Sequence, residues 1–417
     1  MENIQELKYV YLKERNKMNI NEIKETLNYL LDNNLKLQEE GLDKISINLE
    51  GHAGIAKTSI VKQVAEERGA KYVRINLAEL EEIGDLVGIP QKQYVMRNET
   101  NEVLVSEKVV NQYINMGYRL CPDCDPQMTY AIPSWVPKDA DTEVILCLDD
   151  FLRGSMLFQQ AIMSLIQFGE YISWKLPNKC HIILTSNPGD EYTNLSELDD
   201  AQQSRMLTFN VEFDVNIWAK WAEAVGIREE FINFALYAPE IFDRGHIINA
   251  RSYTLFANAL NSVKELSAPA SMCLANSVAM GAFGKDGEYV GGMFAQFINN
   301  KLDKLISPKE MISAQKFDDL VDKLKGILYT DSNYNAAIAS ILTIRLINYI
   351  ETRFEANCEK KESDQIIKRL TELCLHKGVT LLTVDLLYKL IRDLNGKYRS
   401  KCTKLMSNPE IAMKLMS

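Results

Sequence analysis

The sequence of 417 residues has no apolar run of the ~18–20 residues that a membrane-spanning helix needs. Its first residues alternate between charged and apolar side chains and lack the apolar stretch of a secretory signal peptide. It also has no internal repeat and no low-complexity segment. These absences predict a cytoplasmic protein without a membrane segment.

A disulfide framework is not apparent either. The eight cysteines are scattered, and Cys147, Cys180 and Cys273 fall inside predicted core strands and helices, which predicts reduced thiols. Cys121 and Cys124 have C-x-x-C spacing, but no second such pair and no H-x₃-H pattern accompanies them. We therefore expect two exposed loop cysteines and no metal site, with zinc binding or redox use as the alternatives.

An excess of positive charge is lacking, since the net charge is −10. This argues against a protein whose whole surface binds nucleic acid, although it leaves room for a local basic patch. The predicted last long helix carries such a patch: Lys389, Arg392, Lys397, Arg399, Lys401 and Lys404. A basic helix can bind DNA or an acidic partner, but a solvated surface helix is the commoner outcome.

The segment 44–67 has the pattern of a phosphate-binding loop between a strand and a helix. "KISINLEG" is short, β-branched and bounded by polar residues, and apolar residues recur at helical spacing from Ile60 to Ala65. Between them the pattern G-x-x-x-x-G-K-[ST] is nearly matched by Gly51, His52, Ala53, Gly54, Ile55, Ala56, Lys57 and Thr58, followed by Ser59. The alternative is an accidental Lys-Thr run in a strand–helix turn.

This pattern is typical of triphosphate binding because the backbone amides and the positive end of the helix dipole face the phosphates. Lys57 would add a point charge, and the Thr58 hydroxyl could bind Mg²⁺. Ala56 stands where the pattern has glycine. Alanine is tolerated there if its backbone is already helical, as we expect at the start of the helix, and it clashes if φ must be positive.

Two further apolar runs end in polar side chains. "TEVILCLDDF" (142–151) predicts a buried parallel strand whose end presents Asp149, for the Mg²⁺–water shell, and Asp150, which would polarise the attacking water. "CHIILTSNPG" (180–189) ends in Asn187, whose amide could bind the γ-phosphate and that water. Each run could also be a strand that simply ends in a turn, since Asp pairs and Asn-Pro-Gly favour turns.

Arg205 ends a predicted helix and precedes another strand, from where it could reach a neighbouring subunit's nucleotide. The order and spacing of all these elements resemble those of an AAA+ ATPase. "INLAELEEIGDLVGIPQ" (75–91) and the run from 148 to 206 are similar to the MoxR branch. The resemblance is clear over 44–213 and extends to about residue 259.

The resemblance implies a role for each matching residue. Lys57 and Thr58 form the Walker A pair and Asp149 is the Walker B magnesium residue. Asp150 is the catalytic base, Asn187 is sensor 1, Arg205 is the arginine finger and Arg251 is sensor 2. Arg153 matches an arginine near the subunit interface. The family usually has Glu where this chain has Asp150, so we expect an active but slow ATPase with ATP and Mg²⁺ as cofactors.

These observations predict an α/β protein with a P-loop NTPase αβα core and a parallel sheet, followed by an all-α lid and a C-terminal helical region. The expected regions are an N-terminal helical extension (1–40), the core (41–214) with an inserted hairpin at about 91–140, the lid (215–306) and the C-terminal helical domain (307–417).

The first functional hypothesis is a MoxR-like ATPase that forms a homo-oligomer, a hexameric ring as the resemblance implies, and remodels a protein client. The resemblance implies a von Willebrand factor A domain protein as one such client. The second is an AAA+ ATPase of DNA metabolism, such as a clamp loader or a restriction-type translocase. The third is a nucleotide-gated scaffold that hydrolyses ATP very slowly, for which Ala56 and Asp150 are the support.

Overall fold

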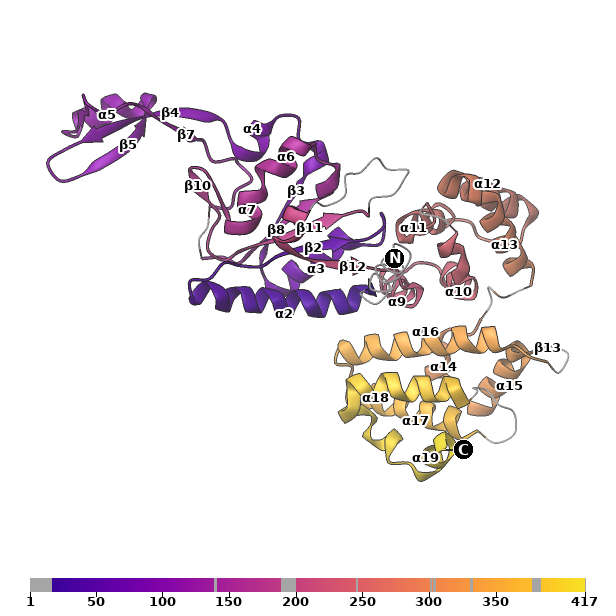
Figure 1. Ribbon diagram of the computed structural model, residues 1–417. Helices are drawn as coiled ribbons and strands as arrows, with labels where there is room; N and C mark the ends of the chain where they lie inside the picture. Colours follow the sequence, from indigo (N-terminus) through magenta and orange to yellow (C-terminus); the bar gives the residue numbers. More distant parts are fainter. Residues whose placement is uncertain are drawn as a thin grey trace, which may run out of the picture. The chain divides into compact units, whose positions relative to one another are not determined.

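The computed structural model describes residues 17–138, 141–188, 200–244, 247–300, 302, 305–330, 333–376 and 384–416 (Figure 1). The chain divides into two compact units, Met1–Glu212 and Phe213–Ser417. Among the described residues, no helix has the length and apolar character needed to cross a bilayer.

The first unit contains a six-stranded parallel sheet. Its order is β1 (Lys17–Met18), β12 (Met206–Val211), β2 (Ser46–Glu50), β11 (Cys180–Ser186), β8 (Val144–Asp149) and β3 (Lys71–Asn76). The strands β8 and β11 are buried along their whole length, in keeping with the apolar runs Val144–Leu148 and Ile182–Leu184 at their centres. Because all six strands are parallel, the residues that follow β2, β8 and β11 meet at one edge of the sheet.

Helices cover both faces of this sheet. Figure 1 shows α2 (Ile20–Glu39) and α3 (Lys57–Arg68) on one side and α6 (Met156–Ala161) and α7 (Met163–Phe168) on the other. Shorter helices are α4 (Ile83–Val87) and α8 (Asp200–Gln203), and β9 (Glu170–Tyr171) pairs with β10 (Trp174–Lys175). The predicted αβα core with a parallel sheet is confirmed.

The helix α2 belongs to the same compact unit as the sheet. A capping box between Asn19 and Glu22 starts it, and the predicted apolar stripe, Ile23, Leu27, Leu30 and Leu31, is buried. Asn34 is buried and exchanges two hydrogen bonds with the backbone of Ile45, at 2.9 and 2.8 Å. These contacts fix α2 to the start of β2.

The insertion between β3 and β8 forms a second, antiparallel sheet. It consists of β4 (Pro90–Arg97), β5 (Glu102–Ser106), β6 (Arg119–Leu120) and β7 (Gln127–Tyr130), with α5 (Val110–Asn115) beside it. β4 and β5 form a hairpin in which Asn98 accepts hydrogen bonds from the turn backbone and Arg97 pairs with Glu102.

The cysteines depart from the prediction at two places. Cys121 and Cys124 form a disulfide, so the prediction of reduced, exposed thiols is wrong for this pair. The turn between β6 and β7 brings their Cα atoms to 5.3 Å, within the range that a disulfide spans. Cys147 and Cys180 are buried as expected, and burial raises the pKa of each thiol. Cys273, by contrast, is exposed on α12.

The second unit is helical, apart from the short pair β13 (Tyr329–Thr330) and β14 (Asn333–Tyr334). In chain order its helices are α9 (Val215–Val225), α10 (Glu229–Tyr237), α11 (Ala250–Ala259), α12 (Pro269–Phe283), α13 (Gly287–Asn299), α14 (Pro308–Ser313), α15 (Phe317–Leu328), α16 (Ala336–Glu355), α17 (Lys360–Leu375), α18 (Val384–Met406) and α19 (Pro409–Met416).

One hydrophobic cluster runs through this unit from Trp218 to Ile411, so the predicted lid and C-terminal regions share a core. A polar cluster lies beside it. Arg345 on α16 is 2% exposed and donates to Glu223 at 2.7 Å, to Glu229 at 3.2 Å and to Asn233 at 3.1 Å. These partners lie on α9 and α10, so α16 is joined to the predicted lid by charge pairs as well as by apolar packing.

Candidate functional site

The loop after β2 packs against the carboxyl ends of the neighbouring strands β11 and β12. The Gly51 amide donates to the Ser186 carbonyl at 3.1 Å, and a Cβ at Gly51 would lie 2.6 Å from the Val211 carbonyl oxygen. Gly54 has a φ of +78°. Gly51 and Ile55 are buried, whereas His52 and Ala53 are exposed, and Ser59 is an exposed residue of the first turn of α3. A side chain at Gly51 would therefore clash, and the backbone conformation at Gly54 favours glycine.

Ala56 does not have the helical backbone that we predicted. Its φ is 75° and its ψ is 20°, in the left-handed region, so that prediction is wrong. The helix begins one residue later, at Lys57, and the loop has to turn back on itself so that two of its carbonyls face the Lys57 side chain. A left-handed alanine costs about 1–2 kcal/mol.

We expect Ala56→Gly to stabilise the protein. Glycine removes that strain, but its greater conformational entropy stabilises the unfolded chain by about 0.4–1 kcal/mol. The free energy of unfolding should therefore rise by about 0.5–1 kcal/mol. Thermal unfolding should show a melting temperature about 2 °C higher.

Gly69→Ala, at the C-cap of the same helix, is the matched control. Gly69 has a φ of +67° and open space around its Cβ position, so alanine there should lower the melting temperature by a similar amount. A lower melting temperature for Ala56→Gly would show that Ala56 carries no backbone strain.

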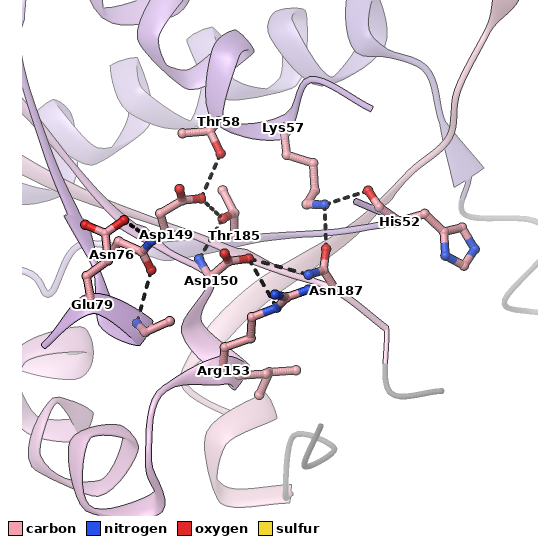
Figure 2. A network of polar contacts seen from close by, with 12 residues as sticks. His52, Lys57, Thr58, Asn76, Glu79, Asp149, Asp150, Arg153, Thr185 and Asn187 are labelled. Atoms are coloured by element: carbon pink, nitrogen blue, oxygen red, sulfur yellow. Dashed lines mark hydrogen bonds and ion pairs between the residues drawn. The ribbon is translucent and has the colours of Figure 1, made fainter. Parts of the chain in front are cut away.

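Lys57 is the first residue of α3, its side chain contacts the preceding loop, and it is 8% exposed. Its Nζ donates to the Gly51 carbonyl at 2.6 Å, to the His52 carbonyl at 2.8 Å and to Asn187 Oδ1 at 3.0 Å. Figure 2 shows the side chains of Lys57 and Asn187 pointing toward each other. The predicted Walker A lysine and the predicted sensor are thus in direct contact.

The Asp149 carboxylate is bound through both of its oxygens. Oδ1 accepts hydrogen bonds from Thr58 Oγ1 at 2.7 Å and from Thr185 Oγ1, while Oδ2 accepts from Arg74 Nε at 2.8 Å. Burial alone raises the pKa of Asp149, but the hydrogen bonds from Thr185, Thr58 and Arg74 outweigh it and hold this pKa below its usual value. Asp149 is therefore ionised at neutral pH.

Sequence reasoning missed Thr185 and Arg74. Thr185 lies two residues before Asn187 near the end of β11, a spacing that could have indicated a second polar side chain directed at the site. Arg74 gave no such signal, because the pairing of β3 with β8 cannot be read from either strand alone.

Asp150 follows β8 in a left-handed conformation, with a φ of 52°. Its amide donates to Thr185 Oγ1 at 3.2 Å, its Oδ1 accepts from Asn187 Nδ2 at 3.4 Å, and Arg153 Nε lies 3.9 Å from Oδ1. Asn187 therefore bridges Lys57 with its oxygen and Asp150 with its nitrogen (Figure 2). Aspartate adopts this backbone region more readily than most residues.

Two predicted residues, Arg205 and Arg251, remain. Arg205 lies away from this cluster, and Arg251 belongs to the second unit. Arg205 precedes β12, whose first residue pairs with Ser46 at the start of β2, so it lies at the opposite edge of the sheet. It donates to Gln167 Oε1 at 2.9 Å and to the Ala201 carbonyl at 2.6 Å. Arg251 is an exposed residue in the first turn of α11, in the second unit.

These residues fit a nucleotide with Mg²⁺. Thr58 and Asp149 offer oxygen ligands 2.7 Å apart, the donor type that Mg²⁺ prefers. Among the described residues, no group of three or more His, Cys, Asp or Glu side chains could enclose a metal. The positive end of the α3 dipole faces the loop where phosphates would lie, and no side chain caps this end of the helix.

The fold of the first unit is a parallel sheet between helices, with a glycine-containing loop that joins β2 to α3. No protein-family model and no curated protein matches the chain in sequence. Among solved structures it is similar to a candidate ATPase from Cytophaga hutchinsonii, with 15% identity, a TM-score of 0.28 and coverage of 81% of this chain and 78% of the other. It is also similar to a RuvB mutant from Thermotoga maritima, with 11% identity, a TM-score of 0.27 and coverage of 94% and 91%. Because both scores are low, the functional argument depends on the site itself.

Proposed function

We propose that this protein is an AAA+ ATPase of the MoxR-like branch that binds ATP with Mg²⁺ and hydrolyses it. The observation that supports this most directly is the double contact of Asn187, which touches both Lys57 and Asp150. An amide at this position can form hydrogen bonds with both the γ-phosphate and the attacking water, which are the groups that react in phosphoryl transfer.

Each residue has a role in this proposal. The loop amides and Lys57 bind the phosphates, and Thr58 and Asp149 hold the Mg²⁺ and its water shell. Mg²⁺, when bound, neutralises charge that develops on the phosphates. Asp150 accepts a proton from the attacking water, while Asn187 orients that water.

The place of Arg205 supports a site shared between subunits. Because Arg205 lies at the edge of the sheet opposite its own loop, its guanidinium would complete a site only in a neighbouring copy. Such a head-to-tail contact generates a closed ring when the rotation between copies closes. Arg251 would act on the nucleotide from the lid, and Arg153 would lie near the same subunit interface.

A ring ATPase of this branch acts on a protein client, for which we propose a von Willebrand factor A domain protein. DNA metabolism is less well supported, because four basic residues of α18 already pair within the second unit. Lys397 pairs with Glu351, Lys401 donates to the Phe354 carbonyl, Lys404 pairs with Asp364, and Arg392 pairs with Asp393.

Mixing two inactive variants tests the shared site. We expect Arg205→Ala and Lys57→Ala each to lose ATPase activity alone. Mixed one to one, they should regain about a quarter of wild-type activity, because each productive interface needs one particular ordered pair of subunits. Phosphate release measures this. The reading fails if Arg205→Ala alone hydrolyses ATP at the wild-type rate or if the mixture stays inactive.

A further inference from the structure

Arg74 contacts the carboxylate that the proposed function assigns to the Mg²⁺ side. It lies on β3, the strand next to β8, where Asn76 pairs with Asp149. Its Nε and Nη2 lie 2.8 and 2.7 Å from the same oxygen, Asp149 Oδ2. The Arg74 side chain is 44% exposed, whereas that of Asp149 is 9% exposed. The guanidinium therefore reaches from solvent onto a nearly buried acid.

This contact has two possible consequences for a bound cation. The guanidinium could hold the carboxylate in a fixed orientation, which would help the metal. The positive charge of Arg74 also partly neutralises the negative charge of Asp149. This weakens the attraction between Asp149 and a metal ion, since Thr58, Arg74 and the metal would all contact one carboxylate.

The charge is the larger of the two effects. Without Arg74, Oδ1 of Asp149 would still accept hydrogen bonds from Thr58 and Thr185, so its orientation would be kept. No second cation is seen to pair with Asp149 among the described residues, so its charge would no longer be offset.

We propose that Arg74 is a positioning residue that acts as a counter-charge to Asp149 and so raises the Mg²⁺ concentration at which the metal tightens nucleotide binding. This inference depends on the proposed nucleotide site. With the Arg74 guanidinium in place, tight nucleotide binding would need a higher Mg²⁺ concentration than without it.

Calorimetric titration of the full-length protein with ADP, in EDTA and over a range of Mg²⁺ concentrations, tests this. Adding Mg²⁺ should increase the affinity for ADP up to a plateau. The readout is the half-point, which is the Mg²⁺ concentration that gives half of this increase. Free ADP binds Mg²⁺ equally in every experiment, so differences between variants come from the protein. Arg74→Met should lower this concentration by about five- to tenfold, since interactions in a half-exposed site are screened. Arg74→Gln, a second neutral variant, should do the same.

Arg74→Lys separates charge from geometry, because lysine keeps the charge but cannot place two donors on one oxygen. Its half-point should stay within about twofold of wild type if charge is the cause. Arg97→Met, which removes an exposed ion pair with Glu102 on the insertion, is the matched control and should change nothing.

An unchanged half-point in both neutral variants would overturn the inference. So would a higher half-point in Arg74→Met and Arg74→Lys alike, because that would mean the guanidinium orients the carboxylate. A wild-type protein that binds no ADP at any Mg²⁺ concentration would instead refute the proposed function. That outcome differs from either of the first two.

Discussion

Lys57→Ala should weaken ATP binding by about 100-fold or more. The side chain supplies the ammonium group that contacts the loop carbonyls, and hydrogen bonds to charged groups contribute about 1.5–3 kcal/mol each. A loss of about 2.7 kcal/mol corresponds to 100-fold in affinity. Calorimetric titration with a non-hydrolysed ATP analogue measures the change.

Lys62→Ala is the matched control, because Lys62 lies on the same helix but its side chain is 61% exposed and pairs with Glu66. It should bind the analogue as wild type does. Since Lys57 also contacts Gly51, His52 and Asn187, circular dichroism has to show that Lys57→Ala is folded. A folded Lys57→Ala protein with near wild-type affinity would rule out this loop as the nucleotide site.

Asp150→Asn should reduce the turnover of bound ATP by about 10²–10⁴-fold, the usual contribution of a positioned general base. ATP affinity should change little, because the loop and Asp149 remain. Asparagine preserves the shape of the side chain and tolerates the left-handed backbone at φ 52°. Single-turnover hydrolysis separates the chemical step from binding and product release.

Asp43→Asn, an exposed change just before β2, is the control and should keep the wild-type rate. Asp150→Glu adds a further comparison. If the short aspartate limits the rate, the longer side chain should speed hydrolysis. If a negligible rate stays unchanged, the geometry of the base is not the cause and the protein is better described as a nucleotide-gated scaffold. Equal turnover in wild type and Asp150→Asn would remove Asp150 from the mechanism.

The fold class was readable from the sequence because its signals are local. The run 44–51 is short, β-branched and bounded by polar residues, and the runs 142–151 and 180–187 are mainly apolar with polar residues near their ends. Each contains a strand of the parallel sheet, and these strands end at the same sheet edge. Asp149, Asn187 and Lys57 came together there because parallel strands share the direction in which they end.

The apolar stripe of α2 was readable for the same reason, since Ile23, Leu27 and Leu30 repeat at helical spacing. The backbone of Ala56 was not. Local helix propensity favoured a helical alanine, but the loop must direct two carbonyls at Lys57, and this contact across the loop imposes a positive φ.

The sequence by itself therefore determined the types of chemical group at the site and the strands that carry them, because period and strand ends depend on neighbours in the chain. Only the tertiary structure decided the pairing of Arg74 with Asp149, the distance of Arg205 from its own loop and the disulfide between Cys121 and Cys124. The first two follow from strand order and the third from a turn between β6 and β7. Such contacts are selected by packing and hydrogen bonding between distant segments or within irregular turns, which local propensity does not encode.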